Sequence, residues 1–135
     1  MHKNKTFASF LASVLGGFGM HRFYLYGKKD VGGWIHLLTV PLSLISIIAG
    51  GNRPILLLAS LFALSVLSGF LEALIIGVTP DEKWDALHNA DSGRHSISGW
   101  PLALLLVLTL GIGAIMAIAM LARTFDLLYT GGAYG

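Results

Sequence analysis

The sequence predicts an all-α, multi-pass transmembrane protein with about four membrane helices and one short interfacial helix. Of the 135 residues, 55% are hydrophobic and only 12% are charged, whereas an average soluble domain carries about 25% charged residues. The apolar residues also gather in long runs, and a helix needs about 20 mostly apolar residues to cross a bilayer. Lipid therefore has to cover much of the surface, and the bilayer is the first expected partner.

Composition and motifs also exclude several functions. The formal charge is only +2, and the nine basic residues are scattered, so no basic stripe indicates nucleic-acid binding. There is no cysteine, which excludes disulfides and thiolate chemistry. The histidines lack local metal-ligand spacing, and no catalytic or phosphate-binding motif is present. We therefore expect no metal, no cofactor and no enzymatic activity; a lipid-modifying enzyme is the least supported alternative.

Four apolar stretches are long enough, or nearly so, to span the bilayer. They cover residues 6–20 (or 6–26 if the His-Arg pair is tolerated), 31–49, 54–78 and 100–122. The second contains Pro41, which removes a backbone donor and predicts a kink or two half-helices. A re-entrant hairpin over residues 31–54 is the alternative. The basic start and short first stretch also resemble a cleaved signal peptide, which is a second alternative.

The loop between the third and fourth stretches carries a helix-start signal. Thr79 and Glu82 form a capping-box pattern around Pro80, which predicts a short helix over residues 80–89. Trp84 would anchor this helix in the interface, although a solvated loop helix remains open. Residues 89–99 are typical of a flexible linker, Ser98 is placed to cap the last membrane helix, and residues 124–135 form a polar, glycine-rich tail.

Small residues recur every four positions in three of the predicted helices. Such rows let helix backbones approach closely, which replaces the hydrophobic driving force that lipid removes. The rows are Ala8, Ala12 and Gly16, with Ser9, Ser13 and Gly17 beside them; Ser65, Gly69, Ala73 and Gly77; and Gly113 and Ala117. They predict close helix packing, either within the chain, in a homo-oligomer or with another membrane protein.

One acid, Glu72, lies well inside a predicted span. A carboxylate there costs a few kcal/mol unless it is paired or neutralised. Arg22 is the nearest fixed cation, so we predict an Arg22–Glu72 pair supported by hydroxyl groups of Ser65 and Ser68, with His21 facing headgroups or water. The alternatives are that Arg22 snorkels to lipid phosphates and that Glu72 is protonated or reaches a water-filled gap.

The motif around Arg22 closely resembles the signature of the TM2 domain, a family named for two transmembrane helices. The matching residues are Gly16, Gly19, His21, Arg22, Phe23, Tyr24 and Leu25. The next glycine of the pattern arrives one residue late, at Gly27, and a looser match follows around residues 69–89. The resemblance implies no enzymatic activity. It divides the chain into a TM2-like membrane domain over residues 1–90, with an inserted helical segment near 41–65, and a linker, extra membrane helix and tail over residues 91–135.

Two functions follow from these features. The first is a non-enzymatic, structural or regulatory component of a membrane, which is expected to be the bacterial inner (cytoplasmic) membrane. The alternative is a small oligomeric transport or ion-conducting unit that uses Glu72 and Arg22. With four spans, the positive-inside rule places the N-terminus outside by a margin of one charge.

Overall fold

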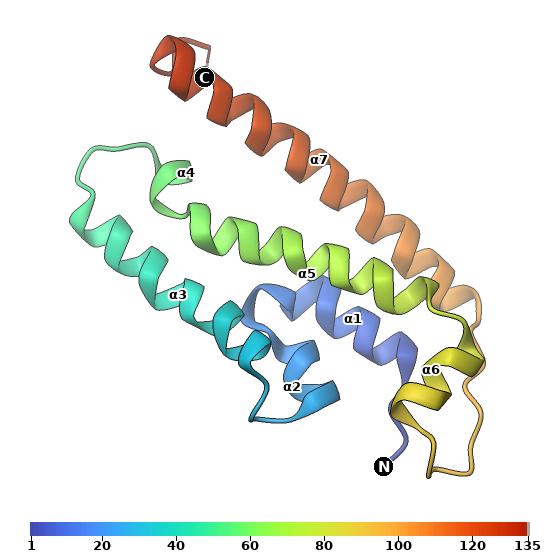
Figure 1. Cartoon of the computed structure of the whole chain (residues 1–135). Helices are drawn as coiled ribbons and strands as arrows, with labels where there is room; N and C mark the ends of the chain where they lie inside the picture. Colours follow the sequence, from blue (N-terminus) through green and yellow to red (C-terminus); the bar gives the residue numbers. More distant parts are fainter. Residues whose placement is uncertain (135) are drawn as a thin grey trace.

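The computed structural model describes residues 1–134, and all its regular secondary structure over that range is helical (Figure 1). The elements, in order, are α1 (Lys5–Leu15), the 3₁₀ helix η1 (Gly16–Phe18), α2 (Met20–Tyr26), α3 (Val31–Ala49), α4 (Ile55–Leu58), α5 (Ser60–Val78), α6 (Asp81–His88) and α7 (Trp100–Thr130). The all-α fold class is therefore confirmed.

Within residues 1–134, three helices, not four, are long and apolar enough to cross a membrane. These are α3, α5 and α7. The first apolar stretch forms only a shorter helical segment, Lys5–Phe18, and at 1.5 Å per residue it falls short of the ~30 Å hydrocarbon core. The predicted first span is therefore absent from the structure.

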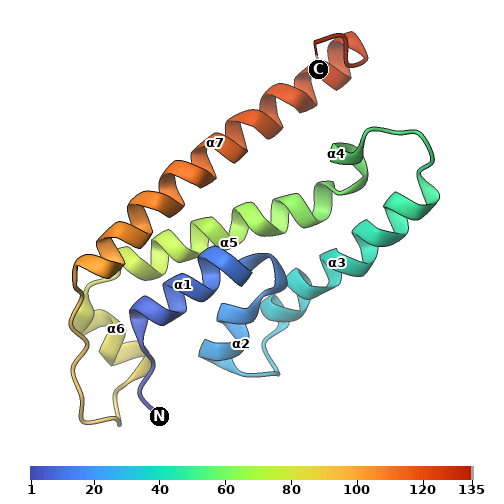
Figure 2. The same ribbon diagram turned by 180° about the vertical axis from the view of Figure 1, so that it is seen from behind.

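The first 30 residues instead form a helical hairpin against α5. α1 runs along α5, η1 ends it, and α2 turns back towards the N-terminus (Figures 1 and 2). The two arms are bonded at their open end, where Lys3 Nζ donates to Tyr24 O at 2.5 Å and the Asn4 amide donates to the Tyr24 hydroxyl at 3.0 Å. Both ends of the hairpin consequently lie at the same end of the molecule.

The helices that follow differ from the sequence predictions at several ends. α3 passes through Pro41 as one continuous helix, so neither half-helices nor a re-entrant hairpin forms. The third stretch is divided at Ala59 into α4 and α5. α7 continues through the predicted polar tail to Thr130, because Arg123 pairs with Asp126 on the same helix and Asp126 also accepts a bond from Thr130.

α6 is neither a lipid-anchored helix nor a free loop helix. Trp84 is only 2% exposed, and its Nε1 donates to Lys3 O at 3.0 Å. The tryptophan is therefore a packing residue that fixes α6 to the N-terminus, and its predicted role as interfacial anchor is wrong. The capping box does not form either, since no side chain caps α6 and the Thr79 hydroxyl donates back to Ile75 O.

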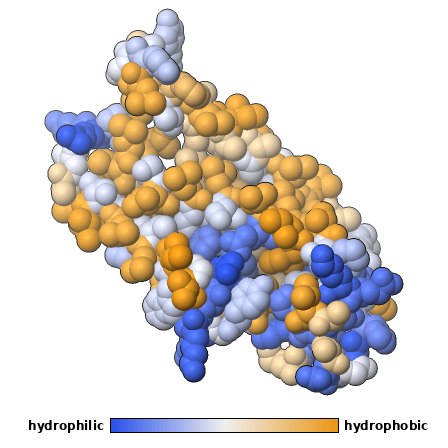
Figure 3. Space-filling view, in the orientation of Figure 1, coloured by the Kyte–Doolittle hydropathy of each residue, from blue (hydrophilic) through white to orange (hydrophobic). Residues whose placement is uncertain are grey.

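Polar residues gather at the end of the molecule that carries the N-terminus. α6, the linker after it and the α2–α3 turn lie there, and the surface between the two ends is mainly hydrophobic (Figures 1 and 3). Seven of the nine basic residues belong to this end, and Arg53 and Arg123 belong to the other. The seven are Lys3, Lys5, Arg22, Lys28, Lys29, Lys83 and Arg94.

Candidate functional site

The helical segment is interrupted at Gly19, and this interruption turns the His-Arg motif towards the interior of the molecule. Gly19 has φ of 72°, in the left-handed region that favours glycine. A Cβ at this position would also lie 2.6 Å from Gly33 O, so glycine permits the close approach of the hairpin to α3. α2 begins directly afterwards and carries His21 and Arg22 to α5.

Three nitrogen atoms from two other helices meet the carboxyl group of Glu72 on α5. Arg22 Nη1 and His21 Nε2 each lie 2.9 Å from Oε2, and His36 Nε2 lies 3.0 Å from Oε1. His21 is fully buried, whereas the Glu72 side chain keeps 23% of its exposure. One acid therefore holds both α2 and α3 against α5.

Arg22 bridges this carboxylate to a second one. Its Nε donates to Asp30 Oδ2 at 2.8 Å, and the same oxygen accepts the Gly33 amide at 2.6 Å, which makes Asp30 the N-cap of α3. The hydrogen bond from Arg22 lowers the pKa of Asp30, and the bond to Asp30 in turn raises the pKa of Arg22. A guanidinium shared between two acids stays charged and fixes the start of α3.

The structure thus brings the predicted Arg22 and Glu72 together but differs around them. The prediction that His21 faces headgroups or water is wrong, because its ring is buried against Glu72. Ser68 is exposed, and Ser65 contacts His36 Nδ1 at 2.7 Å and Gly17 O at 2.8 Å instead of Glu72.

Asp30 and His36 were missed by sequence reasoning. His36 was detectable in principle, because an ionisable residue inside a predicted span points to a polar site by default. Asp30 directly precedes the second apolar stretch, where aspartate is a strong N-cap signal. Their convergence with Arg22 and Glu72 depends on how the helices pack, which spacing along the chain does not encode.

The small-residue rows pack within the chain. α1 buries Ala8 and Ala12, η1 buries Gly16, and α5 buries the row from Ser65 to Gly77. A Cβ on Gly16 would lie 2.6 Å from Gly69 Cα, so the two backbones touch directly. In the third row, Gly113 faces Phe70 of α5, while Ala117 lines a groove between α5 and α7.

A cavity of about 350 Å³ opens beside the Glu72 cluster, between α2, α5 and α6. Polar groups of His21, Arg22 and Glu72 line one part of it, and apolar side chains that include Ile76 and Trp84 line the rest. The cavity connects the buried cluster with the polar end of the molecule. Its lining includes both Glu72 and His88 of α6.

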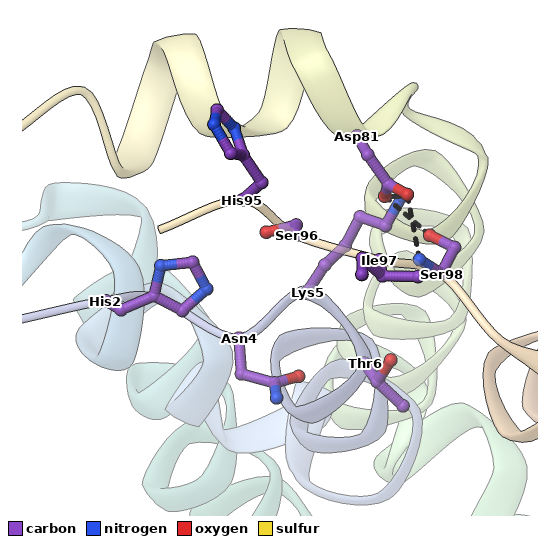
Figure 4. A pocket seen from close by; sticks show the side chains of 9 residues that line it. All are labelled: His2, Asn4, Lys5, Thr6, Asp81, His95, Ser96, Ile97 and Ser98. Carbon is purple, nitrogen blue, oxygen red and sulfur yellow. Dashed lines mark hydrogen bonds and ion pairs between the residues drawn. The ribbon is translucent and has the colours of Figure 1, made fainter. Parts of the chain in front are cut away.

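A second polar cluster joins α1, α6 and the linker at the same end of the molecule. Lys5 at the start of α1 pairs with Asp81 at the start of α6, and Asp81 also accepts bonds from the amide and hydroxyl of Ser98 (Figure 4). Burial opposes ionisation of Asp81, but the bonds from Lys5 and Ser98 outweigh it and lower its pKa. Ser98 therefore binds α6 and does not cap α7, whose N-cap is Gly99.

The linker is attached to α6 at a further point. Asp85 accepts bonds from the Ser96 amide and hydroxyl, each at 2.6 Å, and from Asn89 Nδ2 at 2.8 Å. The bonds from Asn89 and then Ser96 lower the pKa of Asp85 to about 2. The segment predicted as a flexible linker is thus held along α6. Within residues 1–134, no group of three or more His, Asp and Glu side chains has the geometry to hold a metal ion.

Comparison with known families identifies the N-terminal part of the chain. Residues 1–51 match the family model described as the TM2 domain, which confirms the resemblance carried by the Gly-His-Arg motif. The match includes the hairpin, Asp30 and the whole of α3. No curated protein and no solved structure matches the chain.

Proposed function

We propose that this TM2-domain membrane protein is a non-enzymatic structural or regulatory component that assembles with itself or with another protein of the bilayer. The contacts of Glu72 carry the proposal. Both of its oxygens bind side chains of the same chain, so the acid serves to clamp α2 and α3 onto α5. A site for a substrate would need free polar groups directed at the reacting molecule.

The packing of the helices supports an assembly role. The rows on α1 and α5 are used inside the chain, where they pack the hairpin closely against α5. By contrast, only 6% of the most apolar stretch of α7 is buried inside the protein. α7 also diverges from α5 towards its C-terminal end in both views (Figures 1 and 2). The surface available to a partner in the bilayer is therefore greatest on α7 and next greatest on α3, of whose apolar stretch 17% is buried.

The distribution of charge supports an orientation for this component. With three spans, seven basic residues lie at the end that holds the N-terminus and two at the opposite end. The positive-inside rule then places the N-terminus, α6 and the linker in the cytoplasm. This reverses the orientation expected for four spans, because the hairpin returns to the side on which it starts. In a bacterium the corresponding membrane is the inner one.

A transport or ion-conducting unit is the second candidate, and the cavity beside Glu72 favours it. Intramembrane ionisable residues often mark ion pathways. A structural clamp, however, needs no path across the membrane, and the two candidates therefore differ in whether ions move.

Purification in mild detergent and reconstitution into vesicles separate the two candidates. For an assembly component, we expect a defined homo-oligomer or a stoichiometric co-purifying membrane protein, and proton and cation flux equal to that of protein-free vesicles. A flux above this background that Glu72→Gln abolishes would establish the transport function instead. A strictly monomeric protein without any partner would contradict the assembly role.

A further inference from the structure

The Ser65 hydroxyl determines where one hydrogen of His36 must lie. Ser65 Oγ is 2.8 Å from Gly17 O and 2.7 Å from His36 Nδ1. A carbonyl oxygen can only accept, and a hydroxyl has a single hydrogen to donate. Ser65 therefore donates to Gly17 and accepts from His36, so Nδ1 of His36 carries a hydrogen.

The second nitrogen of His36 also requires a proton. His36 Nε2 lies 3.0 Å from Glu72 Oε1, a contact that two unprotonated lone pairs would not make. The proton resides on the imidazole, giving an imidazolium beside a carboxylate, or on Glu72, giving a neutral pair. Both arrangements contain the same single proton in addition to those of a neutral histidine and an ionised glutamate.

We propose that His36 and Glu72 form a proton-binding site at the junction of α2, α3 and α5. The proton comes from water in the 350 Å³ cavity that reaches Glu72, and it returns by the same route. Occupancy of the site controls the hydrogen bond that holds η1 to α5. The inference is independent of the assembly role, because it concerns only contacts within the chain.

The charged neighbours are consistent with an occupied site. α2 contributes His21 and Arg22, Asp30 precedes α3, Glu72 is on α5, and His88 of α6 lines the far side of the cavity. η1 contains no titratable side chain. With the proton bound, the positive charges of Arg22 and of that proton balance the negative charges of Asp30 and Glu72. A neutral cluster is what a low-dielectric environment favours.

His21 supplies a further hydrogen bond to the same carboxyl group. Its Nε2 lies 2.9 Å from Glu72 Oε2 and must donate, because an ionised carboxylate oxygen can only accept. Within residues 1–134, its buried Nδ1 has no hydrogen-bond partner. The His21 and His36 rings lie 5.8 Å apart in an edge-on arrangement.

Release of the proton rearranges one hydroxyl. His36 keeps the hydrogen on Nε2 for Glu72, and its Nδ1 becomes an acceptor. Ser65 then turns its hydroxyl hydrogen from Gly17 O to His36 Nδ1, and Gly17 O loses its donor. A rise in pH at the polar end is thereby converted into a weaker attachment of η1, the turn on which the hairpin depends.

Side-chain ¹⁵N NMR of the histidine-labelled full chain in detergent tests the site directly. The His36 signals are identified by their loss in His36→Gln. We expect either imidazolium shifts at both His36 nitrogens or a protonated Glu72 carboxyl at about pH 5, with loss of that proton by about pH 9. A neutral His36 beside an ionised Glu72 throughout this range would overturn the proposal.

Hydrogen exchange over residues 16–20, corrected for intrinsic rates, tests the coupling. In the wild type we expect protection to fall several-fold between about pH 6 and 9, whereas in Ser65→Ala it should be low and independent of pH. His95→Gln is the matched control, because His95 is 94% exposed in its side chain and remote from Ser65; it should behave as the wild type. Equal pH dependence in the wild type and Ser65→Ala would overturn the coupling through the hydroxyl.

Discussion

Replacing Gly69 by alanine should force α1 and α5 apart. A Cβ at this position would lie 2.7 Å from Gly16 Cα and 3.0 Å from Ala12 O. Both are backbone atoms, which a rotamer change cannot move. Ordinary contact begins at 3.4 Å, so the helices must separate by at least about 0.7 Å at this point.

The cost of this separation follows from the contacts that it weakens. Overpacking a close-packed interface typically costs about 1–3 kcal/mol, and a gap of this size forfeits a quarter or more of each dispersion contact along the seam. The Ser9 hydroxyl, already 3.3 Å from Ala73 O, would also move out of hydrogen-bonding range. We therefore expect Gly69→Ala to lower the free energy of unfolding by about 1–3 kcal/mol relative to a glycine-to-alanine change that causes no clash.

Gly111→Ala provides that reference. Gly111 lies within α7, and a Cβ there would have no neighbour within 4 Å. Both variants gain the same helix propensity, about 1 kcal/mol for alanine over glycine, so their difference isolates the clash. Equilibrium unfolding in mixed detergent micelles, followed by far-UV circular dichroism, measures it. If Gly69→Ala were as stable as Gly111→Ala, the row from Ser65 to Gly77 would not be a close-packed face.

Three further predictions concern charge and orientation. Arg22→Ala and Glu72→Ala should each destabilise the protein by less than the ~3–5 kcal/mol of a fully buried pair, because both side chains are partly exposed. In thermal unfolding, the double variant should lose less stability than the sum of the two single variants. Additive losses would exclude the pair. Asp85 has a folded pKa of about 2, below its unfolded value, so its stabilisation is present above about pH 4 and should be lost as the pH falls towards 2. The difference in melting temperature between the wild type and Asp85→Asn should therefore shrink over this range. A difference that stays constant would contradict this. Cysteines introduced at Asn4 and Ser92 should be labelled from the same side of the membrane, the cytoplasmic one; labelling from opposite sides would restore the four-span arrangement.

The membrane helices were predictable because their signals are local. Length and hydropathy alone place both ends of α3, the end of α5 and the start of α7 at the right residue. The predicted stretches differ from the structure at the start of α5 and at the end of α7. The errors occur where a particular side-chain interaction decides the outcome, either within one helix or between two elements. Asp126 neutralises Arg123 and extends α7, and the bond of Trp84 to the N-terminus changes an expected interfacial anchor into a packed residue.

The hairpin shows why the first apolar stretch was misjudged. Its apolar run ends at Phe18, before the length of a span is reached, and Gly19 permits a left-handed turn. Both features are visible in the sequence. What the sequence does not encode locally is that His21 and Arg22 find partners inside the protein, which makes a turn back towards α5 more favourable than exposure of these groups to headgroups.

The boundary of the family match gives this arrangement a physical meaning. The match ends at residue 51 and includes the groups that converge on Glu72, namely His21, Arg22 and His36. Glu72 itself lies outside the match, on α5, together with Gly69, which contacts Gly16. Without α5, Arg22 would retain only Asp30, two histidines would lose their carboxylate, and the small-residue face of α1 would be uncovered. The N-terminal hairpin and α3 therefore depend on α5 for both charge neutralisation and packing, and the structural unit of this protein extends beyond the matched segment to include at least α5.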